Sequence, residues 1–167
     1  KGGCGLASGG EVICIEGLWG FLYLGILAVV ALIDRDTRII YDRFHIGIAL
    51  LGIAAVWLFP EHGLVDRLIG LAVVSVPMFV LALAVEGAFG GGDIKLMAVS
   101  GFLLGWRAVL FAAFVGLAAG GVYCIVMLAA GRISRKEQIA FGPFLAVGLA
   151  AALFWGDAAA GWYLSLL

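Results

Sequence analysis

The chain has 167 residues, of which 65% are hydrophobic and 13% charged, with a net charge of −1 and a mean hydropathy of +1.19. A soluble domain of this size is about half apolar and about a quarter charged, so the composition excludes an ordinary soluble domain. It predicts an all-α polytopic membrane protein. The longest basic run is Arg135-Lys136, which argues against nucleic acid as a partner.

Apolar runs separated by charged or glycine-rich segments predict about six transmembrane helices. A helix needs about 20 residues to cross a bilayer, with a usual lower bound of about 17. We expect residues 1–167 to form one membrane-embedded domain, with residues 1–14 as a short extramembrane N-terminal segment. In chain order the apolar runs are 15–33, 46–59, 68–85, 94–104, 108–130 and 140–154.

The run 94–104 is too short to cross a bilayer. At 1.5 Å per residue it reaches only about 16 Å, roughly half the hydrocarbon core. We therefore predict a short helix whose glycine-rich start, 90–93, lies below the membrane surface. Irregular backbone at that depth is tolerated where it lines a water-filled cavity, which a hydrolytic site would need.

The distribution of Lys and Arg predicts the orientation. With six crossings, the connections 34–43, 86–95 and 131–139 share one side and together hold seven basic residues, against three on the other side. Because basic residues accumulate on the inner side of a membrane, we expect these three connections to be cytoplasmic and both termini to lie outside.

The segment 89–96, Phe-Gly-Gly-Gly-Asp-Ile-Lys-Leu, contains an acid directly after three glycines. An ionisable residue at membrane depth is a candidate functional residue by default, so Asp93 is the first candidate catalytic residue. The glycines leave bare backbone that another chain can approach closely. The candidate substrate-binding residues are therefore Gly90, Gly91, Gly92, Lys95 and Glu86.

A second acid, Asp34, ends the run 15–33 on the same predicted side as Asp93. Two carboxyl groups that share a proton can split a peptide bond, because the ionised one takes a proton from water while the protonated one donates to the scissile carbonyl or the leaving amine. Asp93 begins a helix, whose dipole favours the anion, and Asp34 ends one, whose dipole opposes it. We therefore expect Asp93 to act mainly as the base and Asp34 as the proton carrier.

Each acid alone also has a simpler interpretation. An aspartate that follows glycine before an apolar run is typical of a helix N-cap, which fits Asp93. Asp34 also fits a solvated loop acid that pairs with Arg35. Asp36 and Asp42 compete with Asp34 as the second acid, although both lie in the more polar part of the loop. The catalytic interpretation depends on Asp34 and Asp93 meeting.

Three ordered segments resemble the type IV prepilin peptidases, a family of Gly-x-Gly-Asp membrane aspartyl proteases. Segment 90–106, GGGDIKLMAVSGFLLGW, resembles the signature, including the Lys-Leu that follows the aspartate. Segment 31–43, ALIDRDTRIIYDR, is similar to the first motif, in which a second Asp follows eight residues later in an Ile-Pro-Asp turn; Tyr41 replaces the proline here. Segment 141–153, FGPFLAVGLAAAL, resembles the last motif.

The resemblance implies a multi-pass aspartyl endopeptidase of the bacterial cytoplasmic (inner) membrane, with its active site toward the cytoplasm. It implies that the partners are the lipid bilayer and a type IV prepilin or pseudopilin precursor, whose leader peptide is removed. It places the family's catalytic pair on Asp34 and Asp93. Many relatives also methylate the new N-terminus and carry two Cys-x-x-Cys pairs, which this sequence lacks, so we do not expect methyltransferase activity from this chain.

Two other functions fit parts of the sequence. Tyr41-Asp42 is similar to the Tyr-Asp motif of presenilin-like intramembrane proteases, which would pair Asp42 with Asp93. A small membrane transporter or channel also uses paired membrane acids, although the chain has no clear internal repeat. His45 and His62 lack ligating partners at a useful spacing, so we expect both at the membrane interface and expect no metal or other cofactor.

Overall fold

The computed structural model describes residues 8–37, 40–58, 63–85, 89–132 and 140–164, and all regular structure in these ranges is α-helical. The expected all-α fold is therefore confirmed. The helices are α1 (Ser8–Thr37), α2 (Asp42–Leu58), α3 (Leu64–Val73), α4 (Ser75–Ala84), α5 (Gly91–Leu104), α6 (Trp106–Ala129) and α7 (Gly142–Leu164).

Three helical stretches within these ranges are long and apolar enough to cross a membrane, namely 17–37, 64–84 and 106–129, and Gly142–Gly156 is a shorter apolar helix. The expected short helix is also present as α5, with 14 residues, but it begins at Gly91, so residues 91–93 are helical and not irregular as expected. Helix α1 already begins at Ser8, and therefore includes half of the segment 1–14 that was expected to lie outside the membrane.

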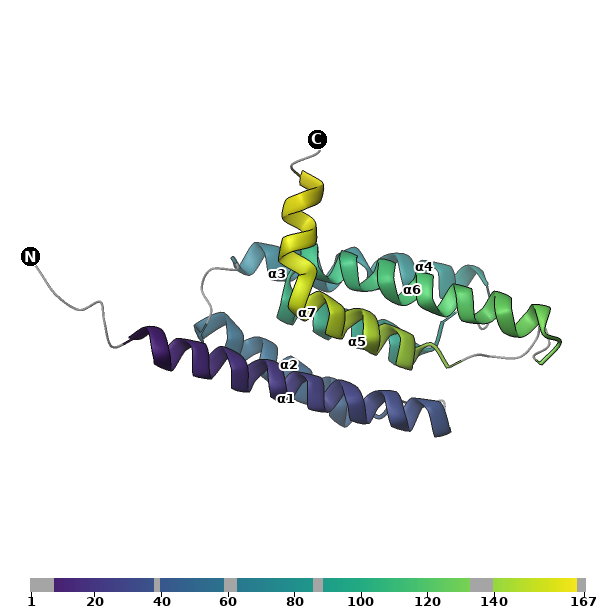
Figure 1. The fold of residues 1–167 in the computed structure, drawn as a ribbon, viewed down its shortest axis with the longest axis horizontal. Helices are drawn as coiled ribbons and strands as arrows, with labels where there is room; N and C mark the ends of the chain where they lie inside the picture. The colour runs from purple at the N-terminus through teal and green to yellow at the C-terminus, as the bar shows by residue number, and fades with distance from the viewer. Residues whose placement is uncertain (1–7, 38–39, 59–62, 86–88, 133–139, 165–167) are drawn as a thin grey trace, which may run out of the picture.

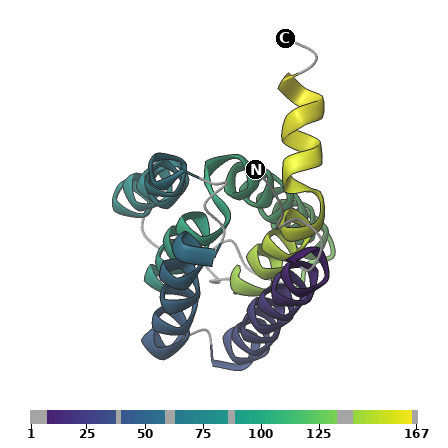
Figure 2. The same ribbon diagram turned by 90° about the vertical axis from the view of Figure 1, so that its left-hand side faces the viewer.

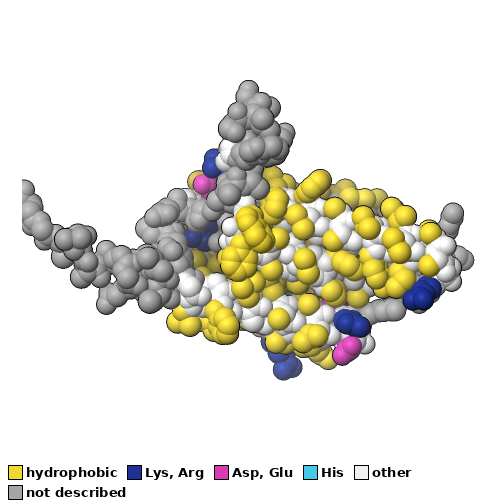
Figure 3. Space-filling model, viewed as in Figure 1, with side chains coloured by type: hydrophobic (Ala, Val, Ile, Leu, Met, Phe, Trp, Pro, Cys, Tyr) yellow, Lys and Arg dark blue, Asp and Glu magenta, His cyan; other side chains and the backbone are white. Residues whose placement is uncertain are grey.

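The helices form a bundle in which α1 packs against α7 and α2 packs against α5, and the C-terminal part of α7 projects away (Figures 1 and 2). The ends of α1, α4 and α6 and the starts of α2, α5 and α7 lie at one end of the bundle, on the right in Figure 1. The face shown in Figure 3 is mostly hydrophobic, with charged side chains at its margins. A lipid-facing surface requires this arrangement.

The stretch 64–84 is interrupted between α3 and α4, where Val74 forms a turn. Pro77 has no amide hydrogen, and its ring crowds the carbonyl four residues earlier, so a regular helix cannot continue through this point. The Ser75 hydroxyl donates to the carbonyl oxygen of Leu71, a bond that also bends helices. The proline and the serine together account for the break.

Glycine allows two pairs of helices to pack backbone against backbone. A Cβ added to Gly101 of α5 would lie 2.1 Å from the carbonyl oxygen of Gly70 in α3, and one added to Gly70 would lie 2.2 Å from that of Gly101. A Cβ on Gly148 of α7 would lie 2.3 Å from the carbonyl oxygen of Ala112 in α6. Close packing of small residues is the main source of helix association in lipid.

Arg67 of α3 is almost fully buried, with 1% of its surface exposed. Its guanidinium donates to the carbonyl oxygens of Leu103 at 2.8 Å and Phe102 at 3.4 Å in α5, and to that of Ala55 in α2 at 3.2 Å. These carbonyls lie near the C-terminal ends of their helices, where acceptors lack helical partners and a cation is favoured. Arg67 therefore joins three helices at one end of the bundle.

Candidate active site

Asp34 lies on the inward-facing side of α1. The buried residues of this helix include Tyr23, Leu27, Val30 and Asp34, which are spaced by four, three and four residues. This spacing keeps them on one face of a helix. The aspartate is 5% exposed, so the helix that forms from an apolar run carries a carboxyl group into the protein interior.

The Asp34 carboxylate meets the start of α7. The Gly142 amide donates to Oδ2 of Asp34 at 3.0 Å. A Cβ on residue 142 would lie 2.5 Å from the same oxygen, so only glycine leaves room for this contact. Because Gly142 is the first residue of α7, the acid also lies at the positive end of a helix dipole.

Asp93 lies in the first turn of α5, which begins at Gly91 after the N-cap residue Gly90. Its Oδ2 accepts a hydrogen bond from the Gly90 amide at 3.3 Å. The aspartate is therefore the third residue of the helix, and not the N-cap itself. Its other oxygen, Oδ1, is buried and has no hydrogen-bond partner. A capping role accounts for one oxygen of Asp93 and leaves the other unexplained.

The two acids lie together at the same end of the bundle, close enough for the charge of Asp34 to act on Asp93. An aromatic pair joins the segments that donate to the two acids: Phe89 precedes Gly90, Phe141 precedes Gly142, and the two rings meet edge to face with centroids 5.6 Å apart. The fold therefore brings together two carboxyl groups that are 59 positions apart in the sequence.

The three glycines before Asp93 have different surroundings. A Cβ on Gly90 would lie 3.3 Å from Oδ2 of Asp93, and one on Gly92 would lie 2.9 Å from Cβ of Ile40. A Cβ on Gly91 would meet nothing within 4 Å, and this residue is exposed. The internal packing therefore requires glycine at 92 and restricts 90, whereas at 91 the protein itself leaves space.

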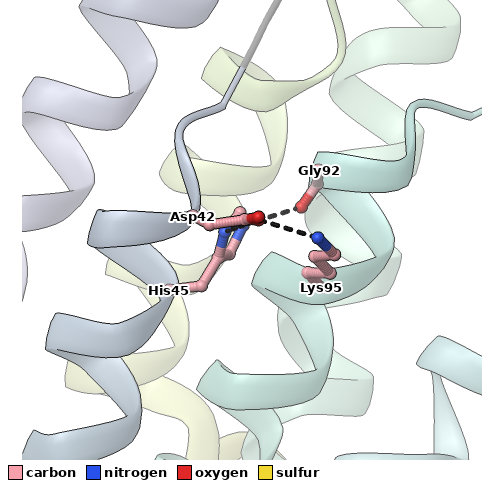
Figure 4. A network of polar contacts seen from close by, with 4 residues as sticks. All are labelled: Asp42, His45, Gly92 and Lys95. Atoms are coloured by element: carbon pink, nitrogen blue, oxygen red, sulfur yellow. Dashed lines mark hydrogen bonds and ion pairs between the residues drawn. The ribbon is translucent and has the colours of Figure 1, made fainter.

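Asp42 is occupied by a different partner. Its Oδ1 accepts a hydrogen bond from Nζ of Lys95 at 2.7 Å, and its side chain is 70% exposed (Figure 4). The hydrogen bond and charge of Lys95 lower the pKa of Asp42 below its ordinary value. Lys95 therefore pairs with Asp42, the exposed acid at the start of α2. In the sequence it lies two residues after the buried Asp93.

His45 is buried, with 5% of its surface exposed, although the sequence predicted an interfacial position. Its Nε2 lies 3.0 Å from the carbonyl oxygen of Gly92. Asp36 is exposed, as expected, but it lies in the last turn of α1 and not in a loop. Glu86 and His62 lie outside the described residues.

Sequence reasoning missed His45 and Gly142 as residues of this site. The signal for Gly142 was present, because Phe-Gly-Pro opens the last apolar run and a Gly-Pro pair often starts a helix. Nothing in the local sequence indicates that His45 faces inward, since its contact with Gly92 depends on how α2 packs against α5.

Comparison with protein families identifies the wider group. The model of the family described as "Type IV leader peptidase family" matches residues 21–125, which is more than half of the chain and includes Asp34 and Asp93. No solved structure gives a significant match.

Curated relatives described as "Prepilin leader peptidase/N-methyltransferase" match over most of the chain. The protein from Bacillus subtilis (strain 168) is 29% identical over 92% of this chain and 62% of its own length. The protein from Legionella pneumophila is 29% identical over 90% of this chain and 54% of its own length. The protein from Stutzerimonas stutzeri is 34% identical over 96% of this chain and 59% of its own length. This chain thus spans between 54% and 62% of the length of these relatives, and it belongs to the type IV leader peptidase family.

Proposed function

We propose that this protein is a membrane aspartyl endopeptidase that removes the leader peptide from type IV prepilin or pseudopilin precursors. The observation that carries the proposal is the buried Oδ1 of Asp93, which has no hydrogen-bond partner and lies in the field of Asp34. A buried polar atom costs free energy unless it is paired. A second carboxyl group and an attacking water molecule are the partners that peptide hydrolysis would supply.

The dipoles of their own helices predicted that Asp93 is the base and Asp34 the proton carrier. The hydrogen bonds around the two acids support the opposite assignment. Asp34 accepts the Gly142 amide hydrogen at the start of α7, an arrangement that favours an anion. Asp93 receives one longer bond from Gly90 and is otherwise buried. We therefore assign the base, which takes a proton from water, to Asp34, and the proton donor to Asp93. The pair would titrate as a coupled unit.

The proposed substrate would be cut at the cytoplasmic face of the inner membrane. The basic residues Arg35, Arg43 and Lys95 lie in the terminal turns of α1, α2 and α5, and Arg132 follows α6, so all four are at the end of the bundle that holds the two acids. An excess of such residues marks the inner side of a membrane. Gly91 offers exposed backbone with free space beside the pair, and an extended peptide needs such backbone to dock its own.

The alternative pairing of Asp42 with Asp93 has less support. Asp42 is exposed and accepts the hydrogen bond from Lys95, which lowers the pKa of Asp42 and opposes the sharing of a proton with a second acid. The transporter interpretation is not favoured by any contact among the described residues.

The test is to incubate the purified protein in detergent with a prepilin and to follow the shortened product. We expect cleavage by the wild type and by Asp42→Ala, and loss of cleavage by Asp34→Ala and Asp93→Ala with both variants still inserted and folded. Cleavage by Asp34→Ala together with its loss in Asp42→Ala would favour the presenilin-like pairing. Ion flux in proteoliposomes without any cleavage would favour a transporter.

A further inference from the structure

A network of polar groups joins the start of α2 to the start of α5 beside the candidate active site (Figure 4). His45 reaches from α2 to the Gly92 carbonyl oxygen, with Nε2 at 3.0 Å. Its other ring nitrogen, Nδ1, lies 3.6 Å from Oδ1 of Asp42. That same carboxylate oxygen accepts the hydrogen bond from Lys95.

The partner of Nε2 fixes which ring nitrogen carries the proton. A carbonyl oxygen can only accept a hydrogen bond, so Nε2 of His45 must be the donor in this contact. The carbonyl has two lone pairs, and can accept the histidine in addition to its place in the helix. The charged groups that face this ring are Asp42 on α2 and Lys95 on α5.

Gly92 directly precedes Asp93, so a bond that holds its carbonyl also orients the peptide unit from which the acid extends. The first turn of α5 has few other restraints of this kind. Gly90 has no side chain with which to cap the helix, and the Asp93 and Ile94 amides both donate to the one carbonyl of Gly90, at 3.1 and 3.3 Å. Three glycines make this stretch intrinsically flexible. A donor from outside the helix is therefore well placed to fix it.

We propose that His45 is a positioning residue for Asp93, and acts by donating an Nε2 hydrogen bond to the Gly92 carbonyl. The inference rests on the proposed function for its effect on cleavage, although the hydrogen bond itself does not depend on that function. The described residues show no hydrogen bond from the ring to Asp34 or Asp93, so its contribution is to hold the first turn of α5, from which Asp93 extends.

Three substitutions of His45 test whether its effect comes from the Nε2 donor or from the rest of the side chain. Glutamine places an amide nitrogen close to the position of Nε2, whereas asparagine reaches only as far as Nδ1, and alanine removes both. We expect His45→Gln to retain cleavage within about threefold of wild type, and His45→Asn and His45→Ala to lose about 10- to 100-fold in kcat with KM little changed, since misplacement of a reacting group acts on the chemical step.

A second measurement does not depend on activity. Hydrogen exchange of the Asp93 and Ile94 amides, measured in detergent, reports whether the first turn of α5 is held closed. We expect faster exchange in His45→Asn and His45→Ala, and exchange close to wild type in His45→Gln. Amides in the middle of α6 serve as the internal reference and should not change.

The possible outcomes separate the two proposals. Equal activity or equal exchange in His45→Gln and His45→Asn would overturn the positioning role, as would lost activity with unchanged exchange. A third outcome is that the wild type cleaves no prepilin while exchange is still faster in His45→Asn and His45→Ala than in His45→Gln. In that case the proposed function is wrong and the positioning role stands.

Discussion

The Gly142 amide donates a hydrogen bond to the Asp34 carboxylate across 108 positions of sequence. This contact attaches the end of α1 to the start of α7, and supplies the acid with a donor at a helix N-terminus. Because a Cβ at residue 142 would collide with the carboxylate, the contact also makes glycine a requirement at this position.

Gly142→Ala should impair catalysis more than folding. The added methyl group would lie 2.5 Å from Oδ2 and 2.7 Å from Cγ of Asp34, and would displace the carboxylate. We expect cleavage to fall by about 100-fold, since an error of about 1 Å in a reacting group has that effect. Stability should fall by about 1–3 kcal/mol, as in other overpacked sites.

The matched control for this substitution is Gly161→Ala in the same helix, where a Cβ would meet nothing within 4 Å. It should leave cleavage unchanged and should not destabilise the helix, because alanine is the better helix former. Cleavage assays and thermal unfolding in detergent measure both effects. Wild-type cleavage by Gly142→Ala would show that the reaction does not need Asp34 in its observed position.

Gly91→Ala and Gly92→Ala should separate substrate docking from internal packing. Residue 91 has open space for a Cβ, whereas one at 92 would lie 2.9 Å from Cβ of Ile40. We expect Gly91→Ala to keep the melting temperature and to lower kcat/KM about tenfold if a peptide backbone passes there. Gly92→Ala should lose about 1–3 kcal/mol of stability. Unchanged kcat/KM in a stable Gly91→Ala would remove this glycine from the proposed substrate site.

Arg67→Met should destabilise the fold without any direct effect on the chemistry. It removes the donors from the carbonyls of Leu103 and Ala55 and leaves them buried. Hydrogen bonds from charged groups contribute about 1.5–3 kcal/mol each, so we expect a loss of about 3 kcal/mol in the free energy of unfolding. Arg107→Met is the control, because Arg107 is exposed and lies over the Trp106 ring in a cation–π interaction worth about 0.5–1 kcal/mol. Similar losses in the two variants would contradict the anchoring role of Arg67.

The Asp42–Lys95 pair should stabilise the protein only while Asp42 is ionised. Lys95 lowers the pKa of Asp42 in the folded protein below its ordinary value of 3.8. The contribution is therefore fully present above that ordinary value, and is lost as the pH falls through the lower pKa of the folded state. Because the pair is largely exposed, the effect should be small and should weaken with added salt.

The measurement for this pair is the difference in melting temperature between wild type and Asp42→Asn as a function of pH. The difference should be largest near neutral pH and should vanish in strong acid, and Lys95→Gln should abolish it. A difference that grew on acidification would mean that Asp42 gains a proton, and not an ion pair, on folding.

The sequence predicted what depends on composition and local pattern. Apolar runs are sufficient to predict an all-α membrane fold, and the short run after the glycines predicted the 14-residue helix α5. Asp34 and Asp93 were selected because acids at the ends of apolar runs are costly. The structure places both in the interior at one end of the bundle.

What the sequence did not predict depends on which helix packs against which. The helix dipoles of α1 and α5 predicted the roles of the two acids, but the start of α7, which also faces Asp34, belongs to a segment more than 100 residues away. His45 was assigned to the interface because it has no ligating partners at a useful spacing in the sequence. Its contact with Gly92 arises from tertiary packing, which local patterns do not encode.

The crossing of α3 and α5 limits how the molecule can move. Because the backbones touch at Gly70 and Gly101, the two helices cannot slide lengthwise past each other without first separating. The depth of α5 in the bundle is therefore fixed relative to α3, and with it the depth of Asp93. Any opening of the bundle would have to displace elements outside this pair, and under the proposed function every precursor would then be cut at the same distance from the membrane surface.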